Sequence, residues 1–534
     1  MNLTRRELMT MFLGAPFAAA ACRNTSDRSL PDGEIVGANW QHGHILLDKR
    51  DYELSEDAWQ NVKIVVVGAG VAGLSAAWKL KKERESDLVI LELEKEAGGT
   101  SRSGESEPVA HPWGAHYLPV PFRENAELVE LLDEMSLTEG LTEDGDIQIK
   151  EQFLCRDPEE RLFYMGRWYP GLYLHAGQSG EDERQLSLFE KEIDYWVSWR
   201  DASKRRAFVV PSALGSDDAM VTELDKVSFG DWLRQKGFTS ERLLWLCDYA
   251  CRDDYGLKLD QTSAWAGLFY FCSRVRAAGT DSRPLMTFPE GNGRFVRHLA
   301  GTVEEHLLRA HTVVSITPKE KGLDVVCLAG NGLRGFRCER VIYASPVFTA
   351  PYMIRGFSDD SPFDAAAFQS NSWFVANLHL KDRPKPAFPN DFPLAWDNVL
   401  YDSPSLGYVN ATHQKGIDHG ATIWTYYYPM CHEENGRTKL FNYEWRDLAD
   451  VCLTDIARAH PDIYDLTERI DIMRWGHAMI SPTPGFVWGG ERQKALEPYR
   501  NIHFAHTDLS GIALFEEAFY HGLRAAERVL SGKR

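Results

Sequence analysis

Runs of apolar residues, separated by turn-forming positions, divide the start of the chain into predicted strands and helices. The run Asn61–Val67 is rich in β-branched residues, which indicates a buried parallel strand. It leads into the glycine-rich turn Gly68–Gly73, and the small and apolar residues Leu74–Leu80 that follow predict a helix. Leu88–Leu91 is a second short strand-like run, and it ends at Glu92. Together these segments predict a strand–helix–strand unit.

The middle of the chain continues with mixed patterns. Residues 288–295 predict a turn that begins a helix extending to about Leu308. Ser228 is a candidate N-cap for a helix that contains Trp232 and Leu233. Further strands are predicted at 312–316, 323–328, 341–344, 373–380 and 423–428.

The glycine-rich turn carries the first chemical signal. Gly68 permits the tight turn, Gly70 lets the backbone approach a pyrophosphate, and Gly73 lets the helix pack closely on the strand. The free N–H groups and the positive dipole end of the helix favour a phosphate there, and Ala72 lies in the same turn. Glu92 closes the next strand, where a carboxylate accepts hydrogen bonds from an adenosine ribose. The pattern predicts a dinucleotide site, and by itself it does not separate NAD from FAD.

Length and composition limit the number of domains and the kinds of partner and metal site to be expected. A chain of 534 residues is longer than a single hydrophobic core usually supports, which indicates two or three domains. Its net charge of −19 argues against nucleic acid as a partner, because phosphate binding needs clustered Lys and Arg. The nine cysteines include no CxxC pair, so no metal site is predicted, although Cys247 and Cys251 would share a helix face.

The first 22 residues have the form of an export signal. Thr4-Arg5-Arg6 precedes the apolar run Leu8–Ala21, which is too short to span a bilayer. This resembles a twin-arginine signal peptide. Ala19–Cys22 also resembles a lipobox, in which Cys22 becomes lipidated, while cleavage after Ala21 and retention as a cytoplasmic helix are the alternatives. The expected location is the periplasm or cell envelope, reached through the twin-arginine export machinery, with a lipid anchor at Cys22 as an additional hypothesis.

The residues after the second strand carry a family resemblance. Glu92 is followed at fixed spacing by Gly98 and Gly99, which resembles the Glu-x5-Gly-Gly-Arg stretch of the flavin amine oxidase family. Thr100 stands where that family commonly has Arg, and Arg102 is the candidate to supply the missing charge to phosphate. The resemblance implies FAD as the cofactor.

Two segments further along the chain extend the resemblance. The segment 111–116 resembles the part of the family that approaches the flavin ring, which implies cofactor contacts at Gly114, Ala115 and His116. Val313 would place strand backbone at the adenine.

The C-terminal segment completes the motif order. Residues 501–508 resemble the last strand of the family, in which Asp508 holds the place of a Glu that contacts the ribityl and phosphate part of FAD. The segment 515–526 resembles the closing helix, whose first residue, Phe515, would lie under the flavin.

The implied fold is α/β, with a Rossmann-type FAD-binding domain interleaved with an α+β substrate domain. We assign residues 1–22 to the signal peptide and 23–60 to a tether and covering segment. The FAD-binding domain is assigned to 61–120, 281–346 and 476–534, and the substrate domain to 121–280 and 347–475.

Catalytic candidates follow from the same resemblance. Amine oxidases of this family often use two aromatic side chains that face the flavin, and the candidates are Trp424, Tyr426, Trp475 and Phe515. Any single one of them is more often an ordinary core aromatic. His116, His413 and His477 are candidate bases, although a single His is more often structural.

One departure from the family pattern leaves the substrate class undecided. Many members carry a Lys near the flavin, and the expected segment 371–374 reads Asn-Ser-Trp-Phe. The leading hypothesis is oxidation of an organic amine, with O2 or a periplasmic carrier as electron acceptor. The alternatives are a desaturase or dehydrogenase of an apolar substrate, of the carotenoid or porphyrinogen type, and a flavin-binding partner protein without turnover.

Overall fold

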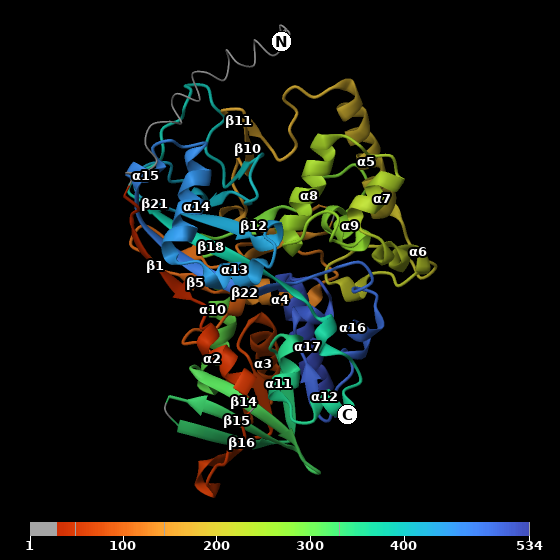
Figure 1. The fold of residues 1–534 in the computed structure, drawn as a ribbon. Coiled ribbons are helices and arrows are strands. Elements are labelled where there is room, and N and C mark those ends of the chain that lie inside the picture. The colour runs from red at the N-terminus through yellow and green to blue at the C-terminus, as the bar shows by residue number, and fades with distance from the viewer. Residues whose placement is uncertain (1–28, 49, 144, 331, 533–534) are drawn as a thin grey trace, which may run out of the picture.

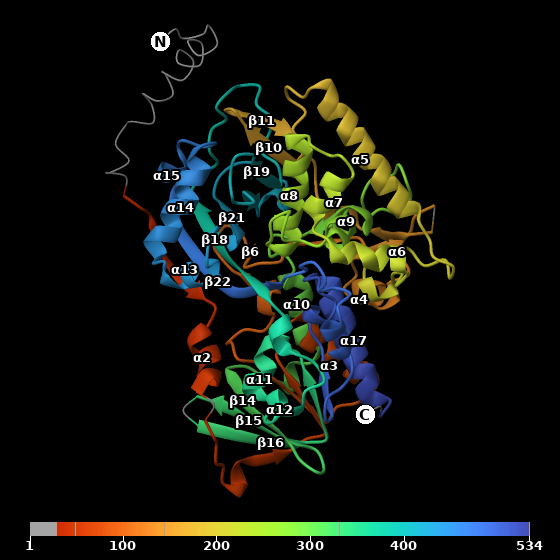
Figure 2. The same ribbon diagram turned by 45° about the vertical axis from the view of Figure 1, so that its right-hand side comes forward.

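The computed structural model describes residues 29–48, 50–143, 145–330 and 332–532. The predicted signal peptide and Cys22 lie outside these ranges. Two lobes share the described chain, and each is built from several separate segments, as the colours in Figure 1 and Figure 2 show. In the described ranges no helix combines the length and apolarity needed to cross a membrane.

The first lobe is built on a five-stranded parallel sheet, the lower part of Figure 1. Its strands run in the order β13 (Leu307–Leu308), β4 (Leu88–Leu91), β3 (Ile64–Val67), β17 (Arg340–Tyr343) and β23 (Ile502–Phe504). Helices α3 (Val71–Lys82), α10 (Gly293–Thr302) and α17 (Phe515–Leu530) pack with one another and share an apolar core with this sheet. A second apolar core joins the sheet to β14 (His311–Pro318), β15 (Leu323–Ala329), β16 (Gly332–Cys338) and β2 (Trp59–Asn61). The predicted Rossmann-type architecture is confirmed.

The second lobe is built on an eight-stranded mixed sheet. Its order is β1 (Asp32–Gly37), β22 (Thr467–Ile480), β18 (Ser370–Leu380), β21 (Thr422–Pro429), β20 (Tyr408–Asn410), β19 (Asp397–Leu400), β10 (Glu160–Tyr164) and β11 (Arg167–Pro170). One face packs on α13 (Gly436–Asn442), α14 (Trp445–Ala457) and α15 (Ile463–Leu466). A helical layer beside the sheet comprises α5 (Gly180–Ser198), α6 (Ala219–Thr222), α7 (Phe229–Gln235), α8 (Glu241–Tyr255) and α9 (Ala264–Cys272).

Short elements complete the described chain. They are α2 (Trp40–His44), β5 (Ser103–Gly104), β6 (His111–Pro112), β7 (Tyr117–Pro119), α4 (Ala126–Glu134), β8 (Thr138–Leu141), β9 (Ile147–Ile149), β12 (Leu285–Thr287), α11 (Ala350–Met353), α12 (Phe357–Asp360) and α16 (Gly490–Lys494). Ser228 caps α7 as predicted, because its hydroxyl accepts a hydrogen bond from the Asp231 N–H at 3.0 Å.

Three segments differ from the sequence patterns. The helix predicted to reach Leu308 ends at Thr302, because Leu307 and Leu308 form the edge strand β13, which pairs in parallel with β4. Strand β16 was not predicted, since its sequence GLRGFRC mixes two glycines with two arginines and lacks an apolar run. Strand β1 lies in the predicted tether and covering segment, yet it pairs with β22 at the edge of the large sheet. Strand β22 also crosses the predicted domain boundary between 475 and 476.

Candidate functional site

The glycine-rich turn joins β3 to α3 and shapes one end of a large cavity. Gly68 has a φ of 99°, which favours glycine. A Cβ on Gly73 would collide with the Gly68 carbonyl oxygen, so strand and helix approach as closely as the motif requires. A Cβ on Gly70 would meet no atom within 4 Å, which leaves open space beside the N-terminus of α3. This combination fits a bound pyrophosphate.

Glu92 follows β4 and its carboxylate is buried beside this turn. Its Oε2 accepts a hydrogen bond from the Ala69 N–H at 2.7 Å, and its Oε1 accepts one from the Glu94 N–H at 2.9 Å. Burial raises the pKa of Glu92, while these two backbone donors oppose the rise. Both oxygens retain lone pairs for further donors, as ribose hydroxyls would be.

The cavity has a volume of about 470 Å³ and is lined by residues from both lobes. Most of the predicted cofactor and catalytic residues line it. These are Gly68, Gly70, Ala72, Glu92, Gly98, Gly99, Thr100, Gly114, Ala115, His116, Val313, Trp475 and Phe515. The match between the predicted nucleotide-binding positions and the cavity wall shows that the residues present fit an FAD molecule.

Three predicted cofactor residues, Gly73, Arg102 and Asp508, lie outside the lining. The Arg102 guanidinium lies 5.2 Å from the Trp475 ring centroid, and its Nη1 is 3.7 Å from Glu94 Oε2. The Asp508 carboxylate accepts a hydrogen bond from the Val347 N–H at 2.8 Å and pairs with His506 Nδ1 at 2.9 Å. The direct FAD contacts of Arg102 and Asp508 stay predictions.

The aromatic strand β21 presents a different residue to the cavity than we predicted. Trp424 and Tyr426 are fully buried in the core between the sheet and α14, so they do not wall a substrate slot. Successive side chains along a strand point to opposite faces, and Tyr427 is the one that lines the cavity. Its hydroxyl donates to the Gly114 carbonyl oxygen at 2.9 Å, and its ring stacks on His116 at a centroid distance of 4.6 Å.

Trp475 and Trp373 add to the same wall. They are paired across β22 and β18, and both line the cavity. The indole Nε1 of Trp475 donates to the Trp113 carbonyl oxygen at 2.6 Å. Phe515, at the start of α17, packs against Phe295 with ring centroids 5.1 Å apart.

The candidate histidine bases divide between two environments. His116 and His477 line the cavity, and burial lowers the pKa of each to about 4. His477 Nδ1 lies 2.8 Å from the Ser370 hydroxyl, and its ring stacks on Phe348. Burial also lowers the pKa of His413 to about 4, although His413 does not line the cavity.

A group of acids in the cavity wall was missed in the sequence. Asp253 and Asp254 come from α8, Asp397 begins β19, and Glu516 is the second residue of α17. Burial is the main cause that raises the pKa of all four carboxyls, to about 7 for Asp253 and Glu516. The adjacent Asp253–Asp254 pair was visible in the sequence, but an acidic pair on a helix usually faces solvent.

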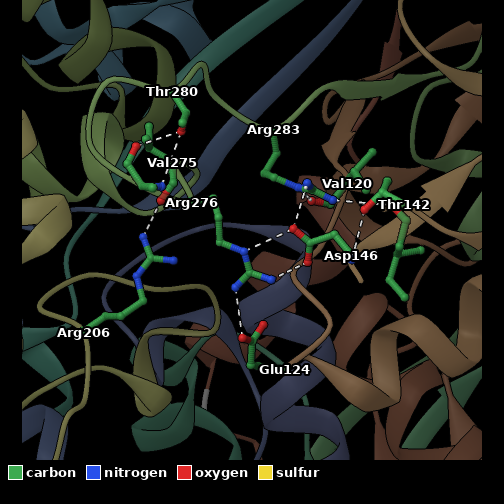
Figure 3. A network of polar contacts seen from close by, with 11 residues as sticks. Val120, Glu124, Thr142, Asp146, Arg206, Val275, Arg276, Thr280 and Arg283 are labelled. Atoms are coloured by element: carbon green, nitrogen blue, oxygen red, sulfur yellow. Dashed lines mark hydrogen bonds and ion pairs between the residues drawn. The ribbon is translucent and has the colours of Figure 1, made fainter. Parts of the chain in front are cut away.

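Arg274 also lines the cavity, and it balances part of this charge. Its Nη2 lies 3.4 Å from Asp254 Oδ2, and its Nη1 lies 3.5 Å from the Tyr117 hydroxyl. The loop that follows Arg274 is fixed by a polar network shown in Figure 3, in which Arg276 and Arg283 both bind Asp146. The Arg283 N–H also donates to the Arg274 carbonyl oxygen at 2.8 Å, which links the Arg274 backbone to this network.

Comparisons with known proteins agree with this geometry. Residues 71–530 match the family model described as flavin containing amine oxidoreductase, which spans well over half of the chain. Among curated proteins, no sequence matches the chain.

Similar solved structures share the fold at low sequence identity. A wild-type putrescine oxidase bound to putrescine is 15% identical, with a TM-score of 0.62, and the match covers 89% of this chain and 100% of that chain. Cyclohexylamine oxidase from Brevibacterium oxydans IH-35A is 14% identical, with a TM-score of 0.61 and coverage of 89% and 99%. A fatty acid isomerase from P. acnes that produces CLA is 16% identical, with a TM-score of 0.59 and coverage of 89% and 99%. Because the family model matches residues 71–530, most of the chain, the chain belongs to the flavin-containing amine oxidoreductase family, and its cofactor is FAD.

Proposed function

We propose that this protein oxidises an organic amine, with bound FAD as the acceptor of a hydride from the carbon next to nitrogen. The observation that carries the proposal is the acidic wall of the cavity, formed by Asp253, Asp254, Asp397 and Glu516. Arg274 pairs with Asp254, which leaves an excess of carboxylates facing the ligand space. A positively charged amine would stabilise their ionised forms and would itself be attracted.

Different residues of the cavity wall would then position the substrate and control the charge around it. The aromatic side chains Trp373, Tyr427 and Trp475 form an apolar wall that positions the substrate carbon chain and excludes water. Transfer of a hydride needs the free lone pair of the reacting nitrogen, so that nitrogen has to be neutral. His116 and His477 stay neutral at physiological pH, because burial lowers their pKa to about 4, and they add no charge that would repel an amine.

An apolar substrate is the second candidate function. The resemblance in fold to a fatty acid isomerase favours it, as does the composition of the described cavity lining, in which no Lys occurs. However, burying several carboxylates against an apolar ligand costs free energy that no partner would offset. We therefore rank the amine first.

Anaerobic mixing of the holoprotein with a substrate panel separates the two candidates. The panel contains primary monoamines, diamines, a polyene and a porphyrinogen, and loss of flavin absorbance is followed. We expect at least one amine to bleach the flavin at a rate that rises with pH, as the bound amine loses its proton. Bleaching by the polyene or the porphyrinogen alone would replace the amine with the apolar substrate. No bleaching by any compound would favour a partner protein without turnover.

Export is a further part of the proposed function. The family resemblance is consistent with a small-molecule substrate and an oxygen-type electron acceptor, and the periplasm or cell envelope is the proposed site of the reaction. Replacing Arg5 and Arg6 with Lys should leave folded, yellow protein in the cytoplasm. An unchanged envelope location of the double variant would reject the twin-arginine route. Mass spectrometry of the mature N-terminus tests lipidation at Cys22.

A further inference from the structure

Three carboxyl groups converge on one side of the cavity from three different elements. Glu160 on β10 and Asp397 on β19 are direct partners in neighbouring parallel strands, so their side chains lie on the same face of the sheet. Asp253 lies on α8, one turn after Tyr249, and the Tyr249 hydroxyl donates to Asp397 Oδ2 at 3.4 Å. Asp253 and Asp397 line the cavity, and Glu160 is not part of its lining.

These acids have no cationic partner in the described part of the chain. None of the ion pairs there involves Asp253, Asp397 or Glu160, and the nearby Arg274 is committed to Asp254 and Tyr117. Burial is the largest cause that raises the pKa of each group, to about 8 for Glu160, and repulsion from neighbouring carboxylates adds to it. Glu159 and Asp253 act on Glu160, Asp254 acts on Asp253, and Glu160 and Asp253 act on Asp397. The repulsion between the carboxylates of such a cluster is relieved by protonation or by a bound cation.

Aromatic rings border the same space. Tyr427 and Tyr249 line the cavity, and the His116 ring lies between Tyr427 and Trp396, with centroid distances of 4.6 and 5.4 Å. Aromatic faces attract an alkylammonium group, and their apolar surface packs on its methylene chain. Acids together with aromatic rings therefore form a site suited to an organic ammonium.

The chemistry of oxidation then limits which nitrogen binds here. The nitrogen that reacts has to be neutral, whereas a nitrogen held by a cluster of carboxylates is stabilised as an ammonium. A monoamine would have to satisfy both demands with one atom. A substrate with two nitrogens can react at the neutral nitrogen while its other nitrogen binds the carboxylates as an ammonium.

We propose that the substrate is a diamine or polyamine whose distal ammonium binds between Asp253 and Asp397, with Glu160 supporting their negative charge. This inference rests on the proposed amine oxidation. It assigns the substrate class and the residues that select it.

A matched series of amines tests the proposal. Butylamine and pentylamine are compared with 1,4-diaminobutane, 1,5-diaminopentane and spermidine, using the FAD-loaded protein without oxygen. Dissociation constants come from calorimetry, and rates of flavin bleaching come from rapid mixing. We expect the diamines or spermidine to bind at least about 10-fold more tightly than monoamines of the same length, because a buried charge-assisted contact contributes roughly a factor of 10 to 100.

Variants identify the residues. Asp253→Asn and Asp397→Asn should each weaken diamine binding by about 10- to 100-fold, and in each variant the loss for 1,4-diaminobutane should exceed the loss for butylamine. Asp253→Glu keeps the charge and should retain most of the preference. Asp260→Asn is the matched control, because Asp260 lies near the end of α8, on the surface, where it pairs with Arg234. FAD content and the unfolding midpoint confirm that each variant is folded.

The outcomes distinguish failure of the distal-ammonium site from failure of the proposed amine oxidation. Equal dissociation constants for monoamines and diamines, or Asp253→Asn and Asp397→Asn variants that keep the diamine preference, would overturn the distal-ammonium site, while bleaching by butylamine would leave amine oxidation in place. If no amine bleaches the flavin and a polyene or porphyrinogen does, the proposed function and this inference both fail.

Discussion

Removal of the Glu92 carboxylate is the sharpest test of the cofactor site. In the free Glu92→Ala variant, water can enter from the cavity and pair with the exposed N–H groups of Ala69 and Glu94, which the carboxylate satisfies in the structure. Binding of FAD would expel that water and leave buried donors unpaired, and the ribose hydroxyls would lose their acceptor. An unpaired buried donor costs about 1–3 kcal/mol, so the FAD dissociation constant should rise by roughly 10- to 100-fold.

The assay is titration of the apoprotein with FAD, followed by quenching of flavin fluorescence. Glu92→Gln should also weaken binding, because its amide NH2 would face one of two backbone donors that both need an acceptor. Glu96→Ala is the control, since Glu96 is exposed four residues further along the same segment. A wild-type dissociation constant for Glu92→Ala would refute the assignment of Glu92 to the adenosine ribose.

Three further predictions concern the fold and the cofactor. Gly73→Ala should destabilise the protein by about 2 kcal/mol or more, because its Cβ would collide with the Gly68 carbonyl oxygen, and an unchanged unfolding midpoint would contradict this packing. Burial, followed by repulsion from Asp254, raises the pKa of Asp253 to about 7 in the folded state. The stability linked to Asp253 is therefore fully present below its unfolded pKa and is lost as the pH rises through about 7. Asp253→Asn should reduce the loss of unfolding free energy between pH 5 and 8 by about 2–3 kcal/mol. Equal losses in the wild-type protein and the variant would contradict the raised pKa. Acid precipitation should release the flavin into the supernatant, as expected of a non-covalent cofactor, whereas yellow precipitate would indicate a covalent bond.

The nucleotide-binding end could be predicted because its signals are local. Gly68 and Gly70 lie within one turn, and Glu92 follows the next strand directly, so spacing alone placed them on the same cavity wall. The contacts of Arg102 with Glu94 and Trp475 were not predicted, because no local pattern reveals them.

The substrate side could not be predicted to the same degree. The run Trp424–Tyr428 is apolar and aromatic at nearly every position, so the sequence does not show which alternate residues face the cavity. The structure shows both faces of β21 buried, one in the core beside α14 and one at the cavity, where Tyr427 lies. The acids Asp253 and Asp397 are far apart in sequence and meet only because α8 packs beside the strand β19.

Product analysis after a single anaerobic turnover tests the central claim most directly. Holoprotein is mixed with excess 1,4-diaminobutane without oxygen, and the carbon skeleton of the product is identified after the flavin has been bleached. Oxidation at the carbon next to nitrogen yields an imine, which water converts to an aminoaldehyde with release of ammonia, and the aminoaldehyde closes on its second amine to the cyclic imine 1-pyrroline. The account therefore predicts about one aminoaldehyde or 1-pyrroline per reduced flavin. A bleached flavin without either product, or a product with a new carbon–carbon double bond in the diamine skeleton, would contradict it.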